Sequence, residues 1–513
     1  MSDDLQPAVG AGETRRIAGS VGLVAGPLLA LIVYGLLPDT FTATGGGVVE
    51  LGHAGRATAA VGTLMAVWWM TEAIEIYATA LLPIALLPLV KASTIEAATA
   101  PYANPLIFLF LGGFLLALSM QRWGLERRIA LATLRFVGTE PRRVIGAVMV
   151  ITAVFSMWVS NTATVAMMLP VALSVIDAAV PGGRAALVGG RDGPGRNFAR
   201  GLLLGIAVAA SIGGVGTLIG TPPNLFLASF ARSTLGVEIS FVKWMAIGIP
   251  LVAVFLPMAW VLLTRVLFPP DVESARLESA LAREQVAAKV SAGEWATLIV
   301  FVVTALAWVL RPLLTDLTIA GATPLASLSD AGIAVVAGAI LFVIPVDRKK
   351  REFVMDWATA RAIPWGILIL FGGGLSLAAA VDVNNVAEYL GAQAQALHVL
   401  PGAVVVAAVA AGVVFLTELT SNTATAAALV PILSGVAPGL GMHPLELAVP
   451  AAIAASLAFM LPVATPPNAI VFGSGYVTMP DMMRVGLRLN LASIVVVTVA
   501  TYALARPVLG VGS

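Results

Sequence analysis

Apolar segments about 20 residues long recur along the chain between residues 17 and 508, and they constrain the fold more than any other feature. A segment of this length crosses the hydrocarbon core of a bilayer as an α-helix. The chain is 59% hydrophobic and only 11% charged, whereas soluble domains average about 25% charged residues. This composition excludes a soluble multi-domain protein. The sequence therefore predicts an all-α polytopic membrane protein.

The scarcity of metal-binding and nucleophilic side chains narrows the function. The chain has no cysteine and three histidines, which argues against disulfides, thiolate metal sites, haem and zinc. The sequence has neither the spacing of metal ligands nor a nucleophile paired with a base, so it does not indicate an enzyme. The formal net charge of +1 gives no reason to expect a nucleic-acid partner. The short polar N-terminus lacks the pattern of a cleaved signal peptide, so we expect none.

Four of the apolar segments are irregular. Segments 145–178 and 401–436 are too long for one span, and each has a Ser-Asn-Thr tripeptide in its middle. These two segments are predicted to be re-entrant hairpins. Segments 200–230 and 446–475 are each interrupted by Thr-Pro-Pro-Asn. Because proline removes a backbone donor and clashes with the preceding turn, these two segments are predicted to be broken helices.

The distribution of basic residues predicts the orientation. With a cytoplasmic N-terminus, eleven spans and two hairpins, 23 of the 29 Lys and Arg residues fall in cytoplasmic segments. This bias follows the positive-inside rule and predicts a bacterial inner-membrane protein with its C-terminus on the periplasmic or extracellular side. The basic run 348–351 anchors this topology, or alternatively binds lipid headgroups. The same assignment leaves no Lys or Arg inside the membrane, so an anionic substrate needs another source of positive charge.

The motifs repeat in the same order in both halves. SNTAT occurs at 160–164 and 421–425, TPPN at 221–224 and 465–468, and glycine pairs lie near Gly112 and Gly373. An odd number of crossings separates equivalent points, which predicts two inverted-topology repeats, the architecture of many secondary transporters. We predict five parts in chain order: an N-terminal tail (1–16), a first span and loop (17–56), a first repeat (57–270), a cytoplasmic linker (271–292) and a second repeat (293–513).

The repeated motifs suit an ion site. Irregular backbone is tolerated at membrane depth only where it is buried in protein or lines a cavity. Helix N-termini at a hairpin tip offer N–H donors and partial positive charge to a carboxylate, while hydroxyl, amide and carbonyl oxygens suit a hard cation. The alternative is that these residues only cap helices and join neighbouring helices. Their recurrence at matching positions favours a binding site.

On these motifs the chain resembles the divalent anion/sodium symporter family, also called the sodium/sulfate symporter family. The stretch 455–471, ASLAFMLPVATPPNAIV, fits the family pattern throughout, and the resemblance covers essentially residues 20–510. The resemblance implies an elevator-type homodimer with scaffold and transport domains. It also implies sodium-coupled uptake of C4-dicarboxylates such as succinate, malate or fumarate. Some branches of the family carry citrate or sulfate.

The resemblance also assigns site residues to positions in this sequence. The co-transported sodium ions would occupy a first site formed by Ser156, Ser160, Asn161 and the carbonyl of Gly220, and a second formed by Thr417, Thr420, Asn422 and the carbonyl of Ala464. The substrate would be bound by Asn161, Thr162, Ser421, Asn422 and Thr423, in a cavity lined by Thr221, Pro222, Thr465 and Pro466. With no embedded basic side chain, anion and cation binding would depend on each other.

The sequence leaves the roles of three acidic residues open. The family often has Glu-Ala-Ile-Pro after the tryptophans of its second span, whereas this chain has Glu72 and, in place of the proline, Glu75. Glu75 either faces an aqueous vestibule or acts in transport. Glu418, beside the second tripeptide, either supports the hairpin or is a proton or cation partner. A sodium-independent dicarboxylate exchanger and a citrate or sulfate transporter remain the alternative functions.

Overall fold

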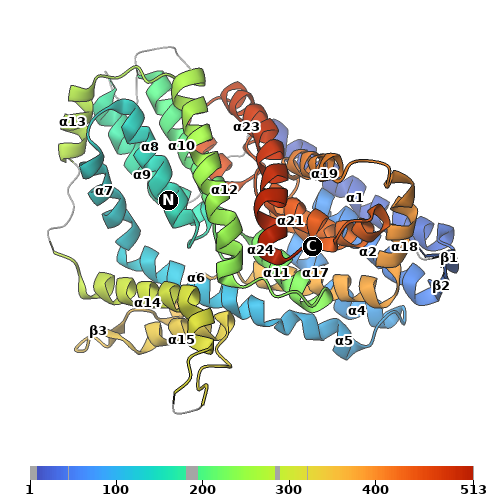
Figure 1. The fold of residues 1–513 in the computed structure, drawn as a ribbon. Helices are drawn as coiled ribbons and strands as arrows, with labels where there is room; N and C mark the ends of the chain where they lie inside the picture. The colour runs from blue at the N-terminus through green and yellow to red at the C-terminus, as the bar shows by residue number, and fades with distance from the viewer. Residues whose placement is uncertain (1–8, 44–45, 181–194, 284–288, 320–321, 512–513) are drawn as a thin grey trace.

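The computed structural model describes residues 9–43, 46–180, 195–283, 289–319 and 322–511. Over these ranges the protein is mostly α-helical, as predicted (Figure 1). Two short antiparallel β-hairpins were not predicted: β1 (Thr40–Thr42) pairs with β2 (Val48–Glu50), and β3 (Pro345–Asp347) pairs with β4 (Glu352–Phe353). Parts of the predicted tail (1–16) and linker (271–292) lie outside the described residues.

The helices follow the predicted apolar segments. The first half contains α1 (Val9–Leu36), α2 (Gly52–Thr71), α3 (Ile76–Thr79), α4 (Leu82–Leu89), α5 (Ile95–Thr99), the short 3₁₀-helix η1 (Ala100–Ala103), α6 (Pro105–Trp123), α7 (Leu125–Val137), α8 (Pro141–Ser156), α9 (Asn161–Ala179), α10 (Arg196–Gly214), α11 (Pro222–Thr234), α12 (Phe241–Val261) and the π-helical turn η3 (Leu262–Leu267).

The second half has a similar series. It contains α13 (Ser274–Arg283), α14 (Ala292–Thr315), α15 (Asp330–Val343), α16 (Trp357–Ala360), α17 (Trp365–Val383), α18 (Val386–Ala394), η4 (Gln395–Leu397), α19 (Gly402–Thr417), α20 (Asn422–Val436), η5 (Ala437–Leu440), α21 (Pro444–Ala455), α22 (Pro466–Gly473), α23 (Met479–Ala500), the π-helical turn η6 (Thr501–Ala505) and α24 (Arg506–Leu509).

Within the described ranges, nine helices are long and apolar enough to cross a membrane by length and composition. Several other apolar segments form shorter helices, among them α15 and α19. The chain is therefore a multi-pass membrane protein, and the count of eleven spans stays a prediction.

Both predicted hairpins and both predicted breaks are present as helix interruptions. Helices α8 and α9 are separated by residues 157–160, and α19 and α20 by residues 418–421. Helices α10 and α11 are separated by residues 215–221, and α21 and α22 by residues 456–465. Pro222 and Pro466 each occupy the first helical position after a break. A proline is tolerated there because the first N–H of a helix has no intrahelical partner.

The two halves make matching helix contacts. Each hairpin packs against the broken helix that follows it, so α8 and α9 contact α10, while α19 and α20 contact α21. The halves also exchange contacts, because α9 packs on α22 and α20 packs on α11. Close approach depends on small residues: a Cβ at Gly213 of α10 would meet the backbone of Ala153 in α8. Small residues at helix interfaces allow this proximity in membrane proteins.

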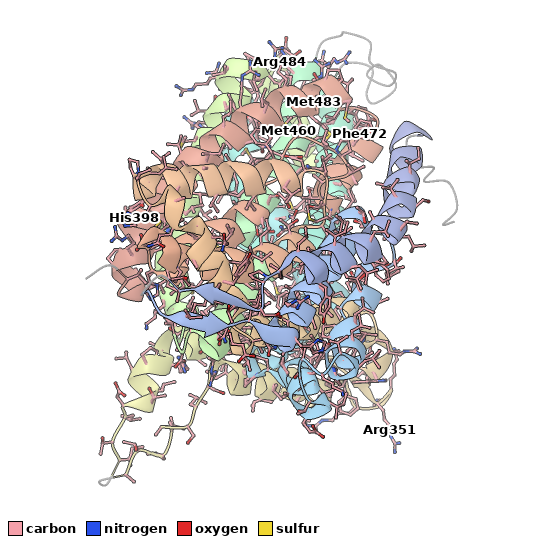
Figure 2. The ribbon with its side chains drawn as sticks, turned by 90° about the vertical axis from the view of Figure 1, so that its right-hand side faces the viewer. Arg351, His398, Met460, Phe472, Met483 and Arg484 are labelled. Atoms are coloured by element: carbon pink, nitrogen blue, oxygen red, sulfur yellow. The ribbon has the colours of Figure 1, made fainter. Side chains whose placement is uncertain are left out.

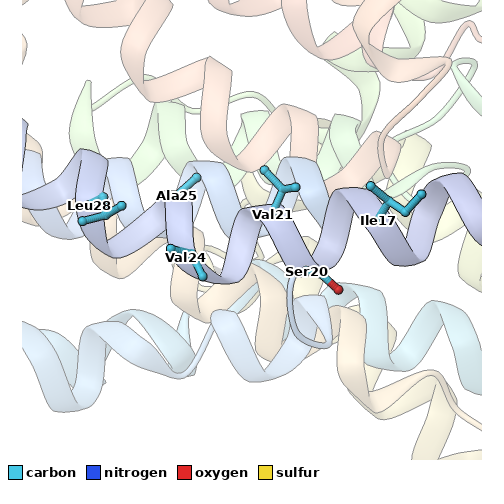
Figure 3. Close-up of a pocket in the computed structure, with 6 residues that line it drawn as sticks. All are labelled: Ile17, Ser20, Val21, Val24, Ala25 and Leu28. Atoms are coloured by element: carbon cyan, nitrogen blue, oxygen red, sulfur yellow. The ribbon is translucent and has the colours of Figure 1, made fainter.

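Helix α1 lies at the periphery. It packs against α2, where Gly22 and Gly26 contact the side chains of Thr71 and Trp68. Its opposite face is apolar and exposed, and it lines a shallow groove of about 610 Å³ (Figure 3). No residue of the repeated motifs lines this groove. The groove is therefore separate from the predicted site.

Three amphipathic helices, α7, α13 and α18, were not predicted as helices. The α7 region was assigned to a cytoplasmic segment rich in arginine, and its helix places Arg128 in a 2.5 Å ion pair with Glu294. These helices are too short and too polar for a search based on apolar segments. Their stability comes from packing on neighbours, which a single sequence does not reveal.

Candidate functional site

The tip of the first hairpin gathers three oxygen atoms. Ser156 ends α8, and its buried Oγ lies 2.5 Å from Oδ1 of Asn161 and 2.7 Å from the carbonyl oxygen of Ala210 in α10. A serine hydroxyl has one hydrogen, so it can donate to only one of these acceptors at a time. The cluster is therefore rich in lone pairs, which suits a small cation.

The first break adds two glycines to this cluster. A Cβ built on Gly214 would lie 2.6 Å from Oδ1 of Asn161 and 3.2 Å from the carbonyl oxygen of Gly220. A Cβ on Gly220 would lie 2.9 Å from the carbonyl oxygen of Ser156. The structure thus brings together three of the four residues predicted for the first sodium site. It adds Gly214, whose only sequence signal was the glycine pair that ends α10.

Ser160, the fourth predicted residue, has a different contact. Its Oγ accepts a hydrogen bond from the N–H of Ala163 (3.3 Å) and so caps the N-terminus of α9. This contact stabilises the hairpin and uses one of the two lone pairs of the hydroxyl oxygen. Capping, the alternative considered for the tripeptide, is thus one role of this serine side chain, and its place in a sodium site stays a prediction.

The second hairpin repeats the arrangement of the first. Thr417 ends α19, and its buried Oγ1 lies 2.7 Å from Oδ1 of Asn422 and 3.1 Å from the carbonyl oxygen of Ala455 in α21. Thr417 occupies the position of Ser156, and Ala455 supplies the carbonyl oxygen that Ala210 supplies in the first cluster. Two oxygen clusters of the same design therefore lie one in each half.

The two remaining predicted residues of the second site make other contacts. The hydroxyl of Thr420 lies 2.6 Å from Oγ1 of Thr425 and 3.0 Å from the carbonyl oxygen of Leu416, so it is used within the hairpin. Ala464 is buried in the second break, where its N–H donates to the carbonyl of Leu461 (3.2 Å). Among the described residues, no hydrogen bond joins Ala464 to Asn422.

The asparagines of the two Thr-Pro-Pro-Asn motifs hold the breaks, a role that the sequence alone did not reveal. Nδ2 of Asn224 donates to the carbonyls of Gly214 (3.0 Å) and Thr217 (2.8 Å). Nδ2 of Asn468 donates to the carbonyl of Leu461 (3.0 Å) in the other half. Both asparagines are fully buried. The signal that could have found them is their recurrence at the end of each motif.

A contact between the halves lies at the two breaks. Oγ of Ser456 is 3.4 Å from Oγ1 of Thr221, and the two residues are separated by 235 positions in sequence. Thr465, the counterpart of Thr221, accepts from the N–H of Asn468 (3.3 Å) and caps α22. The first Thr-Pro-Pro-Asn motif thus contacts the segment between α21 and α22 in the second half of the chain.

The residues predicted to bind substrate differ in exposure. Exposed positions can meet a solute directly, whereas buried ones act mainly through the backbone they support. The exposed ones are Thr162 and Pro466, the partly buried ones are Asn161, Pro222, Ser421 and Asn422, and the buried ones are Thr221, Thr423 and Thr465.

Helix ends supply the electrostatics of this region. At each hairpin tip one helix ends and the next begins, at Ser156 and Asn161 in the first hairpin and at Thr417 and Asn422 in the second. C-terminal carbonyls carry partial negative charge that favours a cation, and N-terminal N–H groups carry partial positive charge that favours a carboxylate. Among the described hydrogen bonds of these four side chains, none involves Lys or Arg.

The segment from Glu72 to Glu75, where this chain differs from the family pattern, forms a turn after α2. Glu72 has φ +49° and lies just after the last residue of α2, so its left-handed backbone ends the helix. Glu75 is exposed and immediately precedes α3. The described hydrogen bonds of the two oxygen clusters involve neither carboxylate.

Comparison with known proteins gives consistent results. The family model described as the sodium:sulfate symporter transmembrane region matches residues 48–511. The chain is 41% identical over 497 residues to the sodium-dependent dicarboxylate transporter SdcS of Staphylococcus saprophyticus, covering 96% of this chain and 92% of that protein. The corresponding Staphylococcus aureus protein is 39% identical with the same coverage.

Two solved structures share the fold. The YdaH transporter of Alcanivorax borkumensis has a TM-score of 0.57 at 14% identity, covering 96% of this chain and 99% of that one. MtrF of Neisseria gonorrhoeae has a TM-score of 0.59 at 12% identity, covering 99% and 97%. At such low identity the likeness extends to the fold alone.

Proposed function

Because this chain belongs to the sodium:sulfate symporter family, we propose that it is a secondary transporter that couples the uptake of C4-dicarboxylates to sodium. The staphylococcal proteins that match nearly the whole chain are named sodium-dependent dicarboxylate transporters. Succinate, malate and fumarate are the proposed substrates. The protein is a transporter and not an enzyme, and sodium is carried with the substrate.

The observation that carries this proposal is the pair of matching oxygen clusters. Ser156 with Asn161, and Thr417 with Asn422, place hydroxyl and amide oxygens within 2.7 Å of each other at two hairpin tips. Each cluster also includes a backbone carbonyl from the helix that follows the hairpin, Ala210 of α10 or Ala455 of α21. Sodium bound at both clusters would supply the positive charge that a dicarboxylate needs where no basic side chain contributes.

The coupling follows from this electrostatic dependence. A dianion near the helix N-termini at the tips would bind weakly without cations, and each cation would bind more tightly beside the dianion. The proposed substrate contacts are Asn161 and Thr162 on one side and Ser421, Asn422 and Thr423 on the other. Thr221, Pro222, Thr465 and Pro466 would line the cavity between them.

We further propose that the two halves are inverted repeats and that transport follows an elevator mechanism. The exchanged packing of α9 with α22 and of α20 with α11 supports a compact moving unit built from both halves. In this proposal the repeats span 57–270 and 293–513, and the protein is a homodimer in the bacterial inner membrane. The N-terminus is cytoplasmic, the C-terminus is periplasmic, and membrane lipid surrounds the apolar faces.

A sodium-independent exchanger is the second candidate. Both oxygen clusters keep hydroxyl-bearing side chains, Ser156 and Thr417, at the matching position, and this favours sodium coupling. Transport of citrate or sulfate in the same fold is the third candidate, because the family model is named for sulfate.

Uptake by the purified protein in liposomes tests the proposal. An inward sodium gradient should drive accumulation of labelled succinate, whereas a potassium gradient should not. Excess unlabelled malate or fumarate should compete, and excess sulfate should not. Counterflow of succinate without sodium, at the rate measured with sodium, would show an exchanger instead.

Two substitutions test the site. Asn161→Ala and Asn422→Ala each remove an oxygen from one cluster, and we expect each to abolish sodium-driven uptake while the protein still inserts and elutes as a single species. The matched control is Asn197→Ala, which changes a partly buried asparagine in the first turn of α10. Unchanged transport in both cluster variants would remove the site assignment.

A further inference from the structure

The carboxylate of Glu418, at the tip of the second hairpin, binds the backbone of the second break. Its Oε1 accepts from the N–H groups of Phe459 (2.8 Å) and Met460 (2.9 Å), and its Oε2 accepts from the N–H of Leu461 (2.9 Å). These three residues are consecutive and lie between α21 and α22. Hydrogen bonds to an ionised acceptor are about twice as strong as neutral ones. One buried side chain therefore fixes the path of this irregular segment.

Helix α23 completes the arrangement. Nδ2 of Asn490, which is fully buried in α23, donates to Oε1 of Glu418 (2.8 Å). A Cβ at Gly486 of the same helix would meet the backbone of Phe459 and Met460, so α23 lies directly against the break. Figure 2 shows Met460 toward the same end of the molecule as the start of α23. Glu418 thus ties together the second hairpin, the second break and α23.

The first half fixes its break in another way. Met157 occupies the position of Glu418, three residues before its Ser-Asn-Thr. There the hydroxyl of Thr217 donates to the carbonyl of Met157, and Nε1 of Trp244 in α12 donates to the carbonyl of Val215 (2.9 Å). The halves share their oxygen clusters and the asparagines that hold their breaks, but the carboxylate contacts occur in the second half. The carboxylate clamp belongs to the second half.

The hydrogen bonds of Glu418 also favour one of its two possible roles. Two carboxylate oxygens offer about four acceptor positions. Oε1 accepts from three N–H donors, those of Phe459, Met460 and Asn490, and Oε2 accepts from the N–H of Leu461. All four donors direct partial positive charge at this carboxylate, which favours a structural role for Glu418 over direct coordination of sodium.

We infer that Glu418 is a positioning residue for the second sodium site. It directly follows Thr417, whose hydroxyl contacts the carbonyl of Ala455, the last residue before the break. The segment held by Glu418 connects Ala455, whose carbonyl contacts Thr417, to Ala464, whose carbonyl is predicted to belong to this site. Holding 459–461 in place keeps these carbonyls where a cation can use them. This inference rests on the proposed function, since it assigns a role within that site.

The transport test compares Glu418→Gln with the wild-type protein in liposomes. Glutamine keeps the size of the side chain, removes its charge and replaces one acceptor oxygen by a donor. We expect the sodium concentration for half-maximal succinate uptake to rise about tenfold, since hydrogen bonds to a charged group are lost. Maximal uptake at saturating sodium should stay within about twofold. Glu418→Asp, which keeps the charge, should recover part of the sodium affinity. Glu388→Gln, the same change at an exposed position of α18, is the matched control.

A second measurement does not depend on transport. Hydrogen–deuterium exchange of the amides of residues 459–461 should be about tenfold faster in Glu418→Gln than in the wild type, because their acceptor is weakened. Exchange over residues 213–221, the first break, should be unchanged and serves as the internal reference. The exchange result does not depend on transport activity. If wild-type liposomes showed no sodium-driven uptake, that outcome would refute the proposed function, and the exchange result would still stand.

The remaining outcomes are decisive as well. An unchanged half-maximal sodium concentration in Glu418→Gln overturns the inference, even if less folded protein is obtained or if exchange is faster. Should Glu418→Gln fail to fold, Asn490→Ala removes one of the four donors and should shift the sodium dependence in the same direction by a smaller factor. No shift in that variant would also overturn the inference.

Discussion

The glycine at the end of α10 offers a direct test of the first sodium site. In Gly214→Ala, the new Cβ would lie 2.6 Å from Oδ1 of Asn161, whereas real Cβ contacts essentially never fall under 3.0 Å. Relief to between 3.0 and 3.4 Å requires the Asn161 amide to move by about 0.4 to 0.8 Å. Functional groups must be held within about 0.5 Å of the productive geometry. The methyl group therefore displaces one oxygen ligand without removing it.

The size of the effect follows from the contact that is lost. An interaction with a charged group contributes about 1.5–3 kcal/mol, which corresponds to a factor of about 10 to 150 in affinity. We expect the half-maximal sodium concentration for succinate uptake to rise by such a factor. Thermal stability should not fall, because replacing glycine by alanine favours the helical conformation by up to about 1 kcal/mol.

The assay is succinate uptake into proteoliposomes over a range of sodium concentrations, together with a thermal melt of each purified variant. Gly412→Ala in α19 is the control, because a Cβ there meets nothing within 4 Å. The position that matches Gly214 in the second half is already Ala458, so alanine is compatible with a break of this kind. A half-maximal sodium concentration within twofold of the wild type in Gly214→Ala would refute the placement of Asn161 in a sodium site.

Three other predictions follow from single residues. Burial raises the pKa of Glu126, on α7 outside the spans, from 4.5 to about 7, so the folded state favours its protonated form and stability is lost as pH rises from about 4.5 to about 7. Glu126→Gln should therefore have a free energy of unfolding up to about 3 kcal/mol higher than the wild type at pH 8 and should melt at a higher temperature. Equal melting temperatures at pH 8 would contradict this. Asp330→Asn removes the 2.9 Å ion pair with Arg311 and should cost about 3 kcal/mol in a denaturation assay, whereas Glu238→Gln at the exposed pair with the same arginine should cost under about 1 kcal/mol. Thr417→Ser should retain sodium-driven uptake and Thr417→Val should lose it, because the hydroxyl oxygen contacts Asn422 (2.7 Å); equal uptake in the two variants would remove this hydroxyl from the site.

Much of the fold could be predicted because a membrane makes simple demands on a sequence. Apolar length predicts spans, and the tripeptides and Thr-Pro-Pro-Asn motifs predict where those spans are interrupted. The hairpins at 145–178 and 401–436 and the breaks within 200–230 and 446–475 are helix interruptions in the structure. The amphipathic helix α7 and the β3–β4 hairpin were missed, because packing on neighbouring elements, and not apolar length, stabilises such elements.

At the site, the sequence by itself determined the chemistry of the ligands. Two repeated motifs supply hydroxyl and amide oxygens, and the pairs Ser156–Asn161 and Thr417–Asn422 lie within one hairpin tip, so short-range spacing was enough to predict them. Only the tertiary structure brought Gly214 and Ala455 to these tips, because both residues belong to other helices. Gly214 of α10 closely approaches Asn161, and the carbonyl of Ala455 in α21 contacts Thr417.

The tertiary structure also supplied the partners of Glu418. Its position beside the second tripeptide is visible in the sequence, but its partners Phe459, Met460, Leu461 and Asn490 lie 41 to 72 residues away. Hydrogen bonds over such separations depend on how whole helices pack, and no local pattern encodes them. The sequence thus determined which atoms can bind an ion, and the packing of the two halves decided which backbone segments hold those atoms in place.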